Sequence, residues 1–193
     1  MSAGLRIAYE TTTVVPRRSG IGRVVEQLAY ALDRTARVGD ELYVLTNGEP
    51  LERLKSAPRR GPLRPTPLWM QMAVPRVARE ERFDLFHFTN STAPVNFTAP
   101  YVTTIHDLSL MRMPEMHPLR RRAYQRTLLK SSAARARLVI TISQASAHDL
   151  QEYLGVPAEK IVVTHVAADD RFHALVDAEA IERVTARYAL DGP

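Results

Sequence analysis

A histidine and an aspartate are adjacent in the sequence, as His106 and Asp107. They follow residues 101–105, a β-branched run typical of a strand, so they lie at the carboxyl end of that strand. Open α/β sheets bind their ligands at this end of the strands. Here His106 can donate a hydrogen bond to a sugar hydroxyl or a phosphate oxygen, and the Asp107 carboxylate can bias the charge state of the ring. The pair is the first candidate site.

A glycine-containing loop offers a second kind of chemistry, anion binding. The segment Ser19-Gly20-Ile21-Gly22-Arg23 follows the first predicted strand and opens the first long helical pattern. Two glycines let a ligand approach the backbone closely, and the free N–H groups and positive dipole end of a helix favour a phosphate. From these residues alone, the simpler interpretation is a turn into a helix that Ser19 caps.

The spacing of other residues argues against several common chemistries. In a G-x-G-x-x-G frame Val25 replaces the third glycine, and no carboxylate ends the second predicted strand, so a dinucleotide site fits poorly. Neither the Gly-Lys-Ser/Thr of a P-loop nor the G-x-S-x-G of a hydrolase occurs. The chain has no cysteine, and none of its six histidines has zinc-ligand spacing. We therefore predict neither a metal site nor a cofactor.

Three histidines outside the candidate site have structural interpretations. His87 and His165 stand within or at the end of predicted strands, and we expect them to be buried or half-buried and satisfied by backbone groups. His148 stands on the polar face of a predicted helix, where we expect it to be solvated.

The composition describes one mildly basic domain. The 193 residues carry 26 Lys and Arg against 21 Asp and Glu, a net charge of +5, and 45% of them are hydrophobic. The excess is modest and the aromatic residues do not interleave with the basic clusters, so we expect no nucleic-acid partner. No run reaches the roughly 18 apolar residues of a membrane span, and the first residues lack the pattern of a signal peptide. We expect a cytoplasmic protein.

Clusters of arginine are the feature that bears on membrane contact. They lie at residues 17–18, 59–60 and 120–122, where they can hold a protein on anionic lipid at the inner face of the membrane. Solvated helix and loop surfaces are the commoner explanation. Peripheral contact is therefore the one membrane association that the sequence supports.

Short β-branched or aromatic runs alternate with helical patterns along the chain. Alternation at this spacing predicts an α/β fold, a doubly wound, Rossmann-like and mostly parallel sheet with helices on both faces. Six strands are predicted, at residues 5–10, 41–46, 84–88, 101–105, 138–142 and 161–165, and five helices, at 22–37, 68–82, 118–137, 143–154 and 177–188.

Several local features are interpreted as structural. Ser143 follows the fifth predicted strand and is placed to cap the next helix, which Gly155 ends. Residues 57–67 are rich in proline and arginine and predict a long exposed loop. A stripe at helical spacing is expected in the core rather than at a lipid surface; it consists of Trp69, Met70, Met72, Val74 and Val77.

Four segments, taken together, resemble the glycosyltransferase family 4 enzymes of GT-B fold, especially bacterial mannosyltransferase-like members. They run nearly from end to end of the chain, in the same order as in that family. They are SGIGRVVEQLAYAL at 19–32, PYVTTIHDL at 100–108, VITISQASAHDLQEYLGVPAEKIVVTHVAAD at 139–169 and RYALDGP at 187–193. The resemblance implies that residues 1–193 are the N-terminal, acceptor-side half of a GT-B enzyme, and that the C-terminal donor-binding domain is absent from this chain.

The resemblance also implies a reaction. A hexose, with mannose as a candidate, is transferred with retention from a nucleoside diphosphate sugar, GDP- or UDP-linked, to a glycan or lipid-linked acceptor. His106 matches the histidine that contacts the donor sugar, and the loop of Ser19, Gly20, Ile21, Gly22 and Arg23 faces the donor phosphates. Asn90, Asp107 and Ser143 are expected in the cleft, on the acceptor side.

Departures from the family pattern limit these expectations. Relatives often carry Pro-Asn-Gly-Val-Asp after the sixth strand, where this chain has HVAAD at residues 165–169. The paired glutamates and the basic residues that grip the diphosphate have no counterpart, so we expect no turnover by this chain alone. The alternative to an enzyme is a stand-alone Rossmann-like module that binds a sugar or nucleotide without catalysis.

Overall fold

Seven parallel strands form one sheet in the computed structural model, in the order β3-β2-β1-β4-β5-β6-β7. The structure describes residues 4–48, 50–56, 66–169, 172 and 177–190, without the side chains of 119–124. The strands are β1 (Arg6–Glu10), β2 (Glu41–Leu45), β3 (Lys55–Ser56), β4 (Leu85–Phe88), β5 (Tyr101–Thr104), β6 (Leu138–Thr141) and β7 (Ile161–Val163). Six of them confirm the sequence prediction to within one or two residues at each end.

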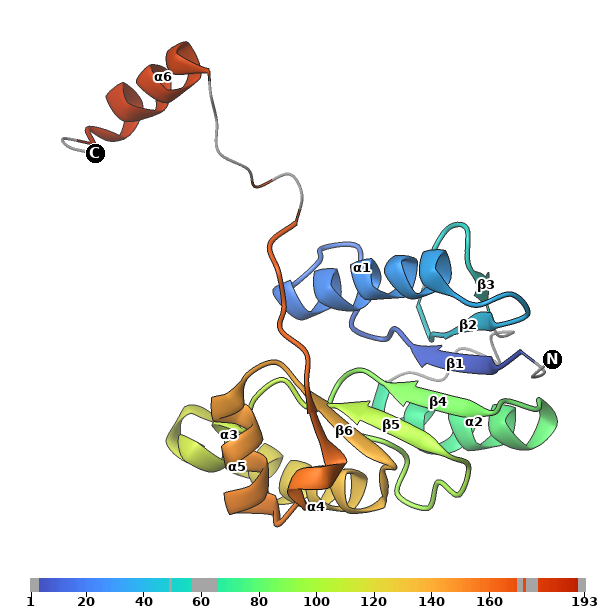
Figure 1. Cartoon of the computed structure of the whole chain (residues 1–193). Helices are drawn as coiled ribbons and strands as arrows, with labels where there is room; N and C mark the ends of the chain where they lie inside the picture. Colours follow the sequence, from blue (N-terminus) through green and yellow to red (C-terminus); the bar gives the residue numbers. More distant parts are fainter. Residues whose placement is uncertain (1–3, 49, 57–65, 170–171, 173–176, 191–193) are drawn as a thin grey trace.

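The order of the strands creates a switch point beside β1. From β1 the chain moves outward to β2 and β3, then returns to the other side of β1 and continues through β4 to β7. The register pairs Ile7 of β1 with Leu42 of β2 on one side and with Leu85 of β4 on the other. All strands are parallel, so their carboxyl ends lie along one edge (Figure 1). Open α/β sheets bind their ligands at the carboxyl ends of the strands beside such a switch point.

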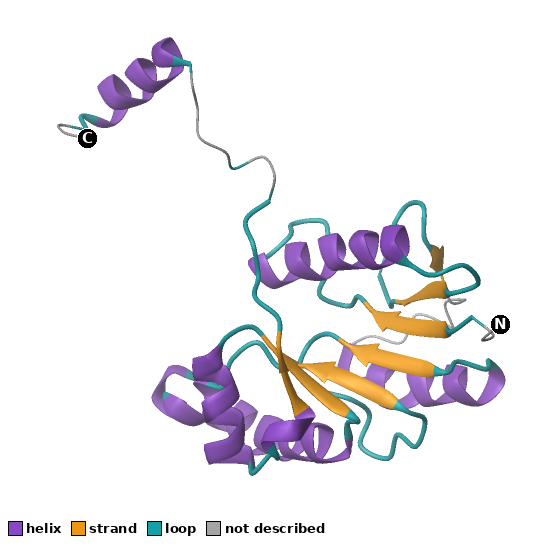
Figure 2. Cartoon of the chain, in the orientation of Figure 1, coloured by secondary structure: helices purple, strands orange, loops and turns teal. Residues whose placement is uncertain are grey.

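Helices cover both faces of the sheet, as predicted, but unevenly. Helix α1 (Gly20–Thr35) lies on one face, whereas α2 (Thr66–Glu80), α4 (Leu119–Arg135) and α5 (Gln144–Leu154) lie on the other (Figures 1 and 2). The short helices α3 (Ser109–Arg112), η1 (Pro114–Met116) and η2 (Ala158–Lys160) lie in the connections, and α6 (Ala178–Tyr188) completes the set.

Each face of the sheet has its own apolar core. Under α1, Val25 and Ala29 pack against Tyr9 and Val44. On the other face four aromatic rings, Phe86, Phe88, Phe97 and Tyr101, meet edge to face, with ring centroids 4.8–5.9 Å apart. Rings at such distances gain about 0.5–1.5 kcal/mol per pair beyond their area burial. The two cores fix the strands, and with them the edge that carries the candidate site.

The predicted stripe in α2 is confirmed except at one position. Trp69, Met70, Val74 and Val77 are buried, but Met72 is 56% exposed. The helix also begins at Thr66, inside the segment predicted as a loop, because Pro67 occupies its first turn, where a missing N–H costs nothing. Residues 57–65 of that predicted loop, the Arg59–Arg60 pair and the side chains of Arg120–Arg122 lie outside the described residues.

Helix α6 stands apart from the sheet and the other helices (Figure 1). Asp177 caps it by accepting hydrogen bonds from the N–H groups of Glu179 and Ala180. Ile181 and Val184 are each 47% exposed and Tyr188 is 62% exposed. Among the described residues, no helix is both long and apolar enough to cross a membrane.

Candidate functional site

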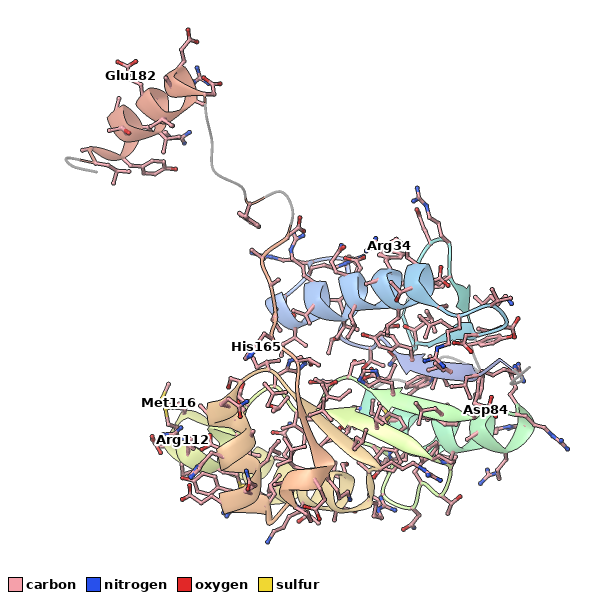
Figure 3. All side chains as sticks on the ribbon, viewed as in Figure 1. Arg34, Asp84, Arg112, Met116, His165 and Glu182 are labelled. Carbon is pink, nitrogen blue, oxygen red and sulfur yellow. The ribbon has the colours of Figure 1, made fainter. Side chains whose placement is uncertain are left out.

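The carboxyl edge of the sheet brings together the loops that hold most of the predicted site residues. Glu10 ends β1, Thr89 follows β4, His106 follows β5 and Ser143 follows β6. These four strands are neighbours in the sheet. Figure 3 shows His165 at this edge and Asp84 at the opposite one. The edge around His106 is therefore the candidate site.

The glycine loop opens α1 at this same edge. Ser19 is the N-cap, and its hydroxyl accepts a hydrogen bond of 3.1 Å from the N–H of Gly22. Helix α1 begins at Gly20, two residues earlier than predicted. Ile21 and Arg23 are exposed. The predicted cap is confirmed, and the positive end of the helix dipole faces the edge of the sheet.

The two glycines of this loop have different surroundings. A Cβ on Gly22 would lie 2.6 Å from the backbone oxygen of Thr13, whereas a Cβ on Gly20 would meet nothing within 4 Å. Gly22 is therefore required by packing of the helix against the preceding loop. Gly20 is not required by the fold, so its lack of a side chain leaves room beside the helix N-terminus for a ligand.

Alanine substitutions should separate these two glycines. Gly22→Ala should lower the free energy of unfolding by about 1–3 kcal/mol, because its new methyl group meets a backbone atom. Gly20→Ala should change it by less than about 0.5 kcal/mol. Urea denaturation of the two variants, followed by circular dichroism, measures the difference. Equal destabilisation by the two substitutions would contradict the claim that packing requires a glycine at position 22 but not at position 20.

His106 is held on both sides by the neighbouring loops. It is 8% exposed, its Nε2 lies 3.1 Å from the backbone oxygen of Thr89, and its own carbonyl accepts a hydrogen bond of 3.1 Å from the Ser146 hydroxyl. A carbonyl oxygen can only accept, so Nε2 carries the hydrogen of this bond. In the neutral ring, Nδ1 is then the acceptor. The neutral ring then offers a ligand an acceptor at Nδ1, and the predicted contact of His106 with a ligand stays a prediction.

Asp107 serves the local backbone. Its Oδ1 accepts a hydrogen bond of 2.8 Å from the N–H of Ser109, the first residue of α3. The side chain is exposed at the same edge as His106. A turn of this kind, in which an aspartate bonds the N–H two residues later, orients the chain after the histidine.

The loop after β4 is strained where it passes the site. Ser91 has φ 66°, a left-handed conformation that serine rarely adopts, and its N–H donates to the backbone oxygen of Thr104 over 2.9 Å. Asn90, the preceding residue, is exposed, and its carbonyl accepts from the N–H of Thr92. Strained non-glycine residues persist where the surroundings fix them, often beside ligand sites.

Ser143 is confirmed as the N-cap of α5. Its hydroxyl accepts from the N–H of Ser146 and donates to the Ser146 hydroxyl, both at 3.1 Å. Gly155 ends the helix with φ 65°, as expected of a C-terminal glycine. Because the Ser143 hydroxyl is used within the helix end, its first role is structural.

Sequence reasoning missed Glu10. This carboxylate is fully buried at the end of β1 and accepts hydrogen bonds from Thr12 and from Thr89, which is 79 residues away. The sequence does carry one signal, because an acidic residue ends an otherwise apolar strand, RIAYE. A buried carboxylate is retained only where donors satisfy it.

His87 also differs from its prediction. It is buried, as expected, but Nε2 lies 2.8 Å from the Thr104 hydroxyl rather than from a backbone group, and its ring meets Tyr9 edge to face at 5.1 Å. Burial lowers the pKa of His87 to about 4, with a further contribution from the charge of His106. His165 was expected to be buried or half-buried; it is exposed, with Nδ1 3.2 Å from the backbone oxygen of Ile142.

Two further features include none of the predicted site residues. A hollow of about 320 Å³ beside the first loop is lined by Val14, Pro16, Arg18, Glu26, Tyr30, Pro50, Leu51 and Glu52. On α5, one ligand atom from each of His148, Asp149 and Glu152 lies within 4.8 Å of the others. Asp149 pairs with Arg112 at 3.4 Å and His148 with Glu152 at 3.5 Å, so ion pairing accounts for this group. His148 is exposed, as predicted.

Solved structures share the fold. The Anabaena protein HepE, in complex with UDP and glucose, superposes with a TM-score of 0.60 at 18% identity, over 95% of this chain and 50% of that one. The S. aureus MnaA–UDP structure gives 0.57 at 13% identity, and a glycosyltransferase from Rickettsia africae gives 0.53 at 15%. This chain is covered to 97% and 98% in these two superpositions, and those chains to 52% and 50%. These superpositions show the fold: the Rossmann-like α/β architecture, as predicted, matches about half of each of these chains.

Sequence comparison identifies the family. The profile of Glycosyltransferase Family 4 matches residues 18–172, so the chain belongs to this family. The O-antigen chain mannosyltransferase B of Escherichia coli is 33% identical over 91 residues, which are 45% of this chain and 24% of that protein. The chain thus spans about half of the solved structures and about a quarter of this relative.

Proposed function

We propose that this chain is the N-terminal, acceptor-side half of a retaining hexosyltransferase. The reaction moves a hexose, with mannose as the first candidate, from a GDP- or UDP-linked sugar to a glycan or lipid-linked acceptor. The observation that carries the proposal is the position of His106 at the carboxyl edge of a family 4 domain, one strand away from the switch point. Two relatives support the substrate class, one named a mannosyltransferase and one solved with UDP and glucose.

The first loop suits the donor phosphates. The N-terminus of α1 carries the positive end of a 16-residue helix, and Gly20 leaves its backbone approachable. These features favour the negative charge that develops on a leaving diphosphate. In this arrangement Ser19, Ile21, Gly22 and Arg23 form the rest of the phosphate-facing loop.

The remaining site residues suit the sugar and the acceptor. His106 orients a hydroxyl of the donor sugar, while the exposed Asn90 and Asp107 and the half-buried Ser143 line the acceptor side of the same edge. Hydroxyl-rich ligands are recognised by a few convergent acceptors and donors of this kind. We place the protein in the cytoplasm, with peripheral contact at the inner face of the membrane when the acceptor is lipid-linked.

A comparison of two forms of the protein tests the proposal. The 193-residue chain and the same chain joined to its donor-binding domain are each incubated with GDP-mannose, UDP-glucose and a glycan acceptor. We expect sugar transfer by the two-domain form only, because the residues that bind the donor diphosphate belong to the second domain. Equal rates for the two forms would contradict this assignment of donor binding to the second domain. Failure of the two-domain form to bind or turn over any nucleotide sugar would contradict the proposed activity.

A further inference from the structure

Glu10 joins two loops of the site, with one carboxylate oxygen for each. Oε1 accepts a hydrogen bond of 2.6 Å from the N–H of Thr12, in the loop after β1, and a second from the Thr12 hydroxyl. Oε2 accepts from the N–H of Thr89 over 3.2 Å and from its hydroxyl over 3.0 Å, in the loop after β4. These are the two loops on either side of the switch point. The fully buried carboxylate therefore bridges the two loops.

Thr89 connects this carboxylate to His106. Its N–H and hydroxyl face Glu10, and the hydroxyl also lies 2.9 Å from the Glu10 backbone oxygen. Its carbonyl oxygen, in the opposite direction, accepts the hydrogen bond from Nε2 of His106. The contacts between Thr89 and Glu10 therefore fix the residue whose carbonyl sets the orientation of the imidazole.

We propose that Glu10 is a positioning residue for His106. By holding Thr89, it keeps His106 in the tautomer with hydrogen on Nε2, so that Nδ1 presents a lone pair to a ligand. The ligand group that fits is a hydroxyl, which can donate to Nδ1, and this is what a bound sugar supplies. This use of the ring rests on the proposed function, whereas its orientation and tautomer do not.

The chemistry requires a carboxylate rather than an amide. Each oxygen of Glu10 faces one backbone N–H, and an N–H can only donate. Glutamine has the same shape but offers one oxygen and one NH₂ group. In Glu10→Gln one of the two loops must therefore lose its bond and face a second donor, a conflict that is costly in a buried position.

Two threonines provide a matched pair of substitutions. Thr12→Val and Thr89→Val each remove one hydroxyl that bonds Glu10, and each preserves the size and β-branching of the side chain. Only Thr89 contacts His106. The proposal therefore predicts that Thr89→Val disturbs the ring and that Thr12→Val does not.

Nitrogen NMR of the 193-residue chain, labelled with ¹⁵N in its histidines, measures the tautomer directly. Spectra are taken near pH 8, where histidine is ordinarily neutral. The wild type should show hydrogen on Nε2 of His106. Glu10→Gln and Thr89→Val should show a mixture of both tautomers, while Thr12→Val should match the wild type. A wild type with hydrogen on Nδ1, or a pure Nε2–H tautomer in both Thr89→Val and Glu10→Gln, would overturn the inference. If Glu10→Gln does not fold, the Thr89→Val and Thr12→Val comparison decides alone.

Turnover of the two-domain protein adds an independent readout. Partners that orient a histidine are worth about 10- to 100-fold in metal sites, and we expect Glu10→Gln to lower kcat by at least about tenfold with little change in KM. Thr12→Val should leave kcat within about twofold of the wild type. If His106→Ala leaves turnover unchanged, the proposed use of His106 fails while the tautomer result stands. If His106→Ala abolishes turnover but Glu10→Gln changes neither tautomer nor kcat, the positioning role fails.

Discussion

Replacing His106 with alanine in the proposed two-domain enzyme should lower kcat about a hundredfold, the scale on which single preorganised polar groups contribute to catalysis. The physical reason is geometric. His106 is 8% exposed, its ring bonds the Thr89 carbonyl, and its own backbone carbonyl accepts from the Ser146 hydroxyl. It lies at the edge where this class of sheet binds ligands. Sugar transfer from a labelled nucleotide sugar, measured at saturating donor, gives the number.

The same substitution must leave the fold intact for this result to be informative. Among the described residues, His106 has one ring hydrogen bond, so its loss should cost the domain about 1–2 kcal/mol of folding stability and leave it folded. His148→Ala is the matched control, because His148 lies on the exposed face of α5 and outside the edge cluster. Unchanged turnover in His106→Ala would remove this residue from the site.

Most of the fold could be predicted because local patterns and global packing agree. The runs RIAYE, ELYVL and LVIT alternate or cluster apolar residues as buried parallel strands do. The caps Ser19, Ser143 and Gly155 act within a few residues along the chain, so their sequence signals are local.

The elements that sequence reasoning missed lack a local signal. Strand β3 has two residues, Lys55 and Ser56, and exists because β2 offers them an open edge to pair with. Helix α3 has four residues, too few to show a period. The start of α2 was predicted as part of a loop because the prolines of residues 57–67 were interpreted as breakers, although Pro67 stands in the first turn of the helix.

The candidate site also has parts that could be predicted from the sequence and parts that could not. His106 and the glycine loop could be found because each is a short motif placed after a predicted strand. The residues that form hydrogen bonds to these motifs could not be predicted. Thr89 is bonded to Glu10 across 79 residues and to His106 across 17, and no periodicity in one sequence reports such contacts. The difference between Gly20 and Gly22 likewise depends on where Thr13 lies in space.

His87 should make the domain sensitive to acid. Burial lowers its pKa from 6.5 to about 4, with the charge of His106 as a smaller cause. Between these two values the unfolded chain binds a proton that the folded chain does not, so stability falls as the pH falls. The contribution is complete above about pH 6.5 and is lost progressively toward pH 4, and its full size is about 3 kcal/mol.

Urea denaturation near pH 7 and near pH 4.5 tests this expectation, because the pH dependence isolates the proton that His87 fails to bind. His87→Gln keeps a group that can bond the Thr104 hydroxyl but cannot titrate in this range. The variant should lose about 2–3 kcal/mol less than the wild type between the two conditions, whatever its stability at neutral pH. His148→Gln, altered at an exposed position, should keep the wild-type dependence. Equal pH dependence in His87→Gln and the wild type would show that the His87 ring accepts its proton in the folded state. This result would contradict the claim that burial between Tyr9 and Thr104 keeps the ring neutral.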